Sequence, residues 1–84
     1  MLNKRKIKLR IKEKEVIQKH ISTDFIRLDS AMKLSVAAAT GGEAKMLIND
    51  EQVKVNGEIC TVRGKKLHEG DSFEYRYVIY EVKR

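Results

Sequence analysis

The spacing of apolar residues changes part-way along this chain, and that change limits the folds open to it. Between residues 28 and 48 the apolar residues recur every three or four positions, which is typical of helices with one buried face. From Val53 onward they tend to alternate with polar residues, which is typical of strands. Helices followed by strands in a chain of 84 residues predict one α+β domain with a small core.

Two short helices are expected. The first begins near Leu28 with Asp29 or Ser30 as a cap, and Gly41-Gly42 stops it because glycine suits the left-handed residue after a helix. The second runs from about Glu43 to Asp50. The buried face of the first helix is expected to hold Leu28, Ala31, Met32, Val36 and Ala39, and that of the second Ala44, Leu47 and Ile48.

Strands are expected at both ends of the chain. Ile7, Leu9 and Ile11 alternate with basic residues, and Phe25-Ile26 looks like a short strand before the first helix. Asn56-Gly57 predicts a hairpin turn. The apolar face switches within residues 73–82, which predicts a bulge or bend in a terminal strand.

The positive charge is concentrated in the first quarter of the chain. Residues 1–20 hold eight Lys and Arg against two Glu, whereas residues 21–84 hold ten basic and ten acidic residues. Such an arm is attracted to polyanions such as nucleic acid, although a solubilising extension or a lysine-protected edge strand explains it too. The cations of the arm are Lys4, Arg5, Lys6, Lys8, Arg10 and Lys12.

Several classes of protein are not expected. No apolar run reaches the length of a membrane span, and the first residues do not resemble a signal peptide, so a cytoplasmic protein is expected. Cys60 is a single cysteine, expected to be a buried structural thiol. With two histidines and no ligand spacing, we expect no metal, no cofactor and no catalysis.

Four motifs carry a resemblance to a known family. They are Arg27-Leu28-Asp29, Gly41-Gly42-Glu43-Ala44-Lys45, Val53-Lys54-Val55-Asn56-Gly57-Glu58, and Arg63-Gly64-Lys65-Lys66-Leu67 leading to Gly70-Asp71. Their order and spacing resemble the S4 RNA-binding domain, most closely the small stand-alone proteins of the YaaA type. The resemblance implies an S4-like (alpha-L) fold, two short helices on a small, mostly antiparallel sheet. We expect this domain at 19–84, after a basic extension, strand or arm, at 1–18.

The family implies an RNA-binding surface made by the two helices and the adjoining hairpin loops. Many S4 domains carry Ser-Arg where this chain has Gly41-Gly42, which removes one arginine contact. The start of the second helix can accept a phosphate. Gly64 lets a backbone approach the cations on either side of it. The candidate RNA-binding residues are Arg27, Lys33, Gly41, Gly42, Lys45, Arg63, Gly64, Lys65 and Lys66.

These observations predict a non-catalytic protein that binds structured RNA through its phosphates. The RNA expected is ribosomal RNA, in a ribosomal subunit or an assembly intermediate, with the arm adding affinity rather than specificity. The alternative is a protein-interaction or regulatory module in which the fold is a scaffold and the arm docks an acidic partner. Tyr75, Tyr77 and Tyr80 can stack on bases, but packing explains them as well.

Overall fold

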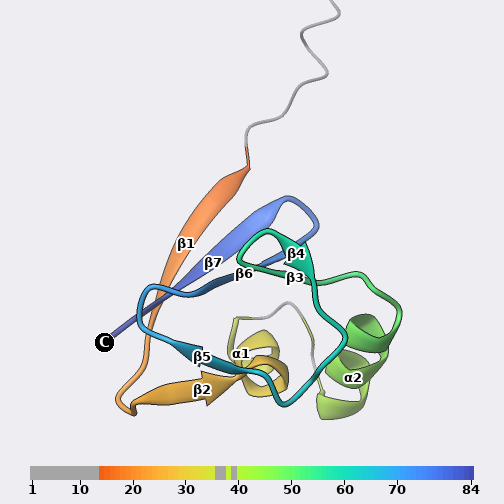
Figure 1. Ribbon diagram of the computed structural model, residues 1–84, viewed down its shortest axis with the longest axis horizontal. Coiled ribbons are helices and arrows are strands. Elements are labelled where there is room, and N and C mark those ends of the chain that lie inside the picture. The colour runs from red at the N-terminus through yellow and green to blue at the C-terminus, as the bar shows by residue number, and fades with distance from the viewer. Residues whose placement is uncertain (1–13, 36–37, 39) are drawn as a thin grey trace, which may run out of the picture.

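The computed structural model describes residues 14–35, 38 and 40–84. Over these residues the chain forms two helices and seven strands (Figure 1). In chain order they are β1 (Glu15–His20), β2 (Phe25–Arg27), α1 (Leu28–Leu34), α2 (Gly41–Asn49), β3 (Lys54–Val55), β4 (Glu58–Ile59), β5 (Lys66–His68), β6 (Ser72–Tyr75) and β7 (Val78–Lys83). The α+β class predicted from the sequence is confirmed.

Five strands form one sheet in the order β1-β7-β6-β3-β4, and β2 pairs with β5 in a separate two-stranded ribbon. Neighbouring strands are antiparallel except β1 and β7, which run parallel from the pair Glu15 and Val78 to the pair His20 and Lys83. In Figure 1 the two helices lie next to each other, with α1 beside the ribbon, below the five-stranded sheet as drawn. Helices and ribbon therefore make one end of the molecule.

A single cluster of buried apolar side chains joins these elements. It includes Leu28 of α1, Ile48 of α2, Leu67 of the ribbon and Phe73 of the sheet, each almost without exposure to solvent. The ring of Phe73 stacks on that of Tyr80 with 4.9 Å between centroids. Because burying a side chain of this size contributes about 1.5 to 3 kcal/mol, this cluster fixes the helices against the sheet.

The first helix is shorter than its apolar spacing predicts, because its last carbonyls find other partners. α1 ends at Leu34, and the buried Ser35 hydroxyl donates to the Ala31 carbonyl at 2.8 Å. The Ala38 amide donates to the Met32 carbonyl at 3.2 Å. These bonds satisfy acceptors at the helix end, so the chain can leave the helix there. Val36 and Ala39, expected on the same buried face, lie outside the described residues.

The prediction that Gly41-Gly42 stops the first helix is wrong. These two residues begin α2, and Thr40 precedes them as the N-cap. Among the described glycines, positive φ angles occur at Gly57 and Gly70. Glycine is compatible with either end of a helix, so its presence between two helical patterns did not identify the helix to which it belongs. The second helix therefore starts two residues earlier than expected.

The turns follow the sequence in one hairpin and depart from it in another. Asn56 and Gly57, with φ of 50° and 89°, join β3 to β4 as predicted. Residues 73–82 do not form one bent strand: Arg76 and Tyr77, with φ of 54° and 68°, turn the chain back between β6 and β7. The apolar face switches because the chain reverses direction.

Three expectations concern other parts of the chain. The strand with Ile7, Leu9 and Ile11 and the cations Lys4, Arg5, Lys6, Lys8, Arg10 and Lys12 lie outside the described residues. The proposed division between residues 18 and 19 falls within β1 and stays a prediction. Cys60 is half-buried rather than buried, with its Sγ 3.7 Å from the Val62 carbonyl oxygen. No helix among the described residues is both long and apolar enough to cross a membrane.

Candidate nucleic-acid interface

The basic loop after β4 is held against the start of α1. The Leu28 amide donates to the Lys65 carbonyl at 2.9 Å, and the Asp29 amide donates to the Arg63 carbonyl at 3.0 Å. The first amides of a helix have no acceptor within it, and here loop carbonyls supply acceptors for two of them. The side chains of Arg63 and Lys65 remain exposed. Backbone hydrogen bonds thus connect Arg63 and Lys65 to the first turn of α1, more than thirty positions away in the sequence.

Arg27 lies across this loop. Its guanidinium donates to both carboxylate oxygens of Asp29, at 3.2 and 3.1 Å, and a methyl group added at Gly64 would meet its Nη2 at 3.5 Å. The space beside Gly64 therefore holds the Arg27 side chain. The expected cap is also different: Arg27 occupies the N-cap position of α1 without a side-chain bond, and Asp29 accepts the Ser30 amide from within the first turn.

The start of α2 gathers another group of the predicted residues. Thr40 Oγ1 accepts a hydrogen bond from the Glu43 amide at 3.1 Å. The backbone amides of Gly41 and Gly42, in the first turn, have no acceptor within the helix. The aliphatic stem of Lys33, from α1, lies beside Gly41: a methyl group added there would be 3.9 Å from Lys33 Cδ. Lys45 is the fifth residue of α2 and so begins the second turn, whereas a helix that began at Glu43 would have placed it in the first.

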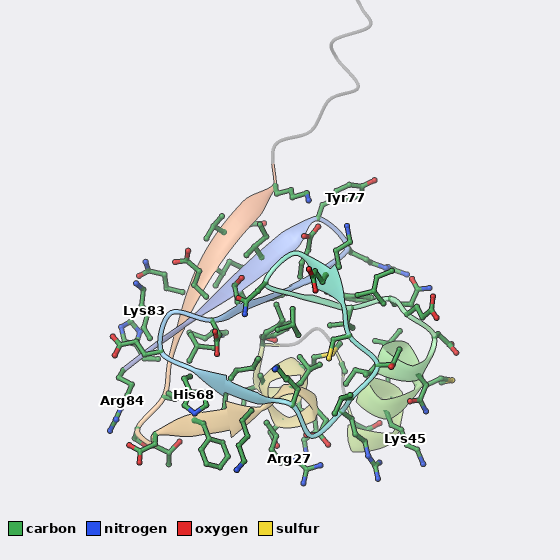
Figure 2. The ribbon with its side chains drawn as sticks, viewed as in Figure 1. Arg27, Lys45, His68, Tyr77, Lys83 and Arg84 are labelled. Atoms are coloured by element: carbon green, nitrogen blue, oxygen red, sulfur yellow. The ribbon has the colours of Figure 1, made fainter. Side chains whose placement is uncertain are left out.

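The cations of residues 21–84 fall into two groups by the elements that carry them, and Figure 2 shows that Lys83 and Arg84 lie on the same side of the molecule as His68. Figure 2 shows Arg27 and Lys45 projecting from the lower end as drawn, with Tyr77 at the opposite end. Lys54, Arg76, Lys83 and Arg84 belong to the five-stranded sheet and its flanks. The remaining six cations belong to α1, α2, the ribbon and the loop, and we call them the basic edge: Arg27, Lys33, Lys45, Arg63, Lys65 and Lys66.

A polar clip fixes the turn between β5 and β6. Asp71 accepts the His68 amide at 2.8 Å and the Asn56 side-chain amide at 3.2 Å, while Asn56 Oδ1 accepts the Ser72 amide at 3.0 Å. The backbone bond from His68, the Asn56 side chain and the charges of His68 and Lys65 hold the pKa of Asp71 below its usual value, against the effect of partial burial. The clip ties the β3–β4 hairpin to the end of the ribbon.

Comparison with known proteins identifies the fold. Residues 19–83 match the S4 domain. The chain belongs to the S4 domain family. It is also 39% identical over 54 residues, 64% of this chain and 76% of the relative, to the probable ribosome maturation protein RlbA of Bacillus subtilis (strain 168). The resemblance predicted from the four motifs is thereby confirmed.

This S4 domain also displays a feature that sequence reasoning missed. Phe25 pairs across the ribbon with His68, their ring centroids lie 5.9 Å apart, and Lys66 Nζ lies 4.8 Å from the Phe25 centroid. The tyrosines differ from one another: Tyr80 is buried in the S4 domain, Tyr75 is half-buried, and Tyr77 is 64% exposed. The residues around Phe25 in the sequence did not predict this arrangement, because its neighbours in space, His68 and Lys66, belong to β5.

Proposed function

We propose that this S4 domain protein is a non-catalytic RNA-binding protein that recognises structured RNA through its phosphates. One observation carries the proposal. The loop that contains Arg63 and Lys65 is hydrogen-bonded to the start of α1, and this places the two cations close to Arg27. The RNA we propose is ribosomal, in a subunit or an assembly intermediate. The similarity to a probable ribosome maturation protein of Bacillus subtilis supports this choice.

The proposed mechanism is electrostatic. Cations of the basic edge pair with phosphates, while the packed helices keep the distances between those cations fixed. The first amides of α2 offer a further anion contact beside Lys33. Because the major groove of an RNA helix is deep and narrow, such a surface reads backbone shape rather than base edges. The arm, including Lys4, Arg5, Lys6, Lys8, Arg10 and Lys12, is proposed to add affinity.

We propose binding without catalysis and without a cofactor. Within residues 14–35, 38 and 40–84, no group of three or more His, Cys, Asp or Glu could hold a metal ion. The shifted groups have structural causes: Asp71 is held by the polar clip, and burial together with the charge of Glu15 raises the pKa of Tyr80.

The first experiment is cosedimentation with separated ribosomal subunits over a salt series. The double variant Arg63→Gln, Lys65→Gln removes two cations from the basic edge, and Lys54→Gln, Arg76→Gln removes two from the five-stranded sheet as a matched control. Each phosphate contact contributes roughly 0.7 to 0.9 to the slope of log affinity against log salt, so the first variant should lower the slope by about 1.5. An equal effect of both variants would contradict a localised site.

A second comparison tests the arm and the alternative function. A version beginning at Lys14 keeps all of β1, which starts at Glu15. If the core recognises RNA, both versions should retain the same subunit, and the shorter one should show a smaller salt slope. If only the intact chain binds, and binds both subunits and unrelated RNA equally, the interaction-module alternative is favoured.

A further inference from the structure

The ribbon has one face in the core and one face toward solvent. β2 and β5 pair residue by residue, with Phe25 opposite His68, Ile26 opposite Leu67 and Arg27 opposite Lys66. Leu67 is fully buried and Ile26 packs against the core. Because side chains alternate along a strand, the other two pairs point outward on one face. That face carries two rings at one end and two cations at the other.

The ring end of this face is open to a ligand. Phe25 is 37% exposed and the side chain of His68 is 59% exposed, with an angle of 51° between their ring planes. The polar clip holds the backbone of His68, since its amide donates to Asp71 at 2.8 Å. Lys66 Nζ, 4.8 Å from the Phe25 centroid, shows that the ring face is accessible from the cationic end. An exposed cation–π contact of this kind is weak, so a stacked base can replace it.

The cationic end lies within reach of the same nucleotide. Residues two apart on a strand are separated by about 6.6 Å. This is the distance from Phe25 to Arg27 on β2 and from His68 to Lys66 on β5, and one nucleotide spans it from its base to its phosphate. The Arg27 side chain is 52% exposed even though it is paired with Asp29. When a base covers Phe25, the Lys66 ammonium is released from the ring and can pair with the phosphate.

We propose that the outer face of the β2–β5 ribbon binds one unpaired nucleotide of an RNA, with its base stacked on Phe25 and His68 and its phosphate paired with Lys66 and Arg27. This inference rests on the proposed function and adds to it a preference for RNA in which a base has left the helix. Stacking tolerates any base, so the ribbon selects an unpaired position rather than a sequence.

The test uses the full chain and two probes, a fully paired RNA duplex and the same duplex with one bulged adenosine. The intact protein should bind the bulged duplex about tenfold more tightly, the effect of one stacked base. Phe25→Leu keeps an apolar side chain without a ring, so it should remove that preference and leave affinity for the paired duplex unchanged. Tyr77→Leu removes an exposed aromatic ring at the opposite end of the molecule, as the control, and should leave the preference intact.

A second variant gives a readout that a packing role for Phe25 does not change. The chain contains no tryptophan, so the Phe25→Trp variant has a single one, whose emission should be quenched by the bulged duplex and not by the paired duplex. Equal affinity for both duplexes, together with unquenched emission, would overturn this inference while leaving the proposed function in place. Failure of the intact protein to bind either duplex at low salt would overturn both.

Discussion

Replacing Gly42 by alanine should stabilise the protein. Gly42 is the second residue of α2, its φ is not positive, and an added methyl group would meet no atom closer than Thr40 Oγ1 at 3.9 Å. Alanine therefore fits the folded state without strain and restricts the unfolded chain. We expect a gain of about 0.5 kcal/mol in the free energy of unfolding, and a rise of about 2 to 4 °C in Tm for a domain of this size.

The sign of this change distinguishes the two places that Gly42 could have in the fold. A glycine that ends a helix in the left-handed conformation loses about 1 kcal/mol or more when it becomes alanine. Gly57, with φ of 89°, is a control of that kind, so Gly57→Ala should lower Tm by several degrees. Thermal unfolding followed by circular dichroism measures both variants. If Gly42→Ala lowers Tm as much as Gly57→Ala does, Gly42 does not begin α2.

Three further predictions concern stability. Thr40→Ala should cost about 1 kcal/mol because the Glu43 amide loses its acceptor, and Thr40→Ser should restore most of the loss in urea unfolding. The pKa of Asp71 is lowered on folding, so its contribution is present above about pH 4 and is lost as the pH falls through the lowered value. Asp71→Asn should cost about 1 kcal/mol at pH 7 and flatten the dependence of stability on pH in that acidic range; an unchanged dependence would contradict this assignment. Leu28→Ala, at a side chain with 0% exposure, should cost about 2 to 5 kcal/mol, and a loss below about 1 kcal/mol would contradict its place in the core.

The sequence predicted those parts of the fold that depend on contacts between residues close together in the chain. Asn56 and Gly57 adopt the positive φ angles that their residue types favour, so the β3–β4 hairpin was predictable. Arg76 and Tyr77 adopt similar angles although neither residue type favours them. Pairing between β6 and β7 and the stacking of Phe73 on Tyr80 hold that turn, and such contacts are not visible in the turn residues themselves.

The candidate site shows the same division between local and distant causes. The sequence and its family resemblance supplied the cations of the basic edge, but whether Arg63 lies near α1 depends on backbone bonds to Asp29. The neighbours of Phe25 likewise follow from the pairing of β2 with β5. Residues 63–66 look like an ordinary basic loop in the sequence, yet a strand begins at Lys66. The strand forms by pairing with β2, which lies far away in the sequence, so the local residues did not predict it.

Because β1 pairs with β7 in parallel, the first strand of the sheet has to wait for the last one to be synthesised. Their paired residues lie 63 positions apart, so β1 leaves the ribosome long before its partner has been made. The hydrogen bonds within each helix join near neighbours, but helices of seven and nine residues are stable only once they pack on the core, which includes Leu67 and Phe73. Until β7 emerges, no other strand among the described residues pairs with β1, and a chain stalled before Val78 presents β1 as a template for other nascent chains. Completion of β7 is therefore the step that pairs one edge of β1.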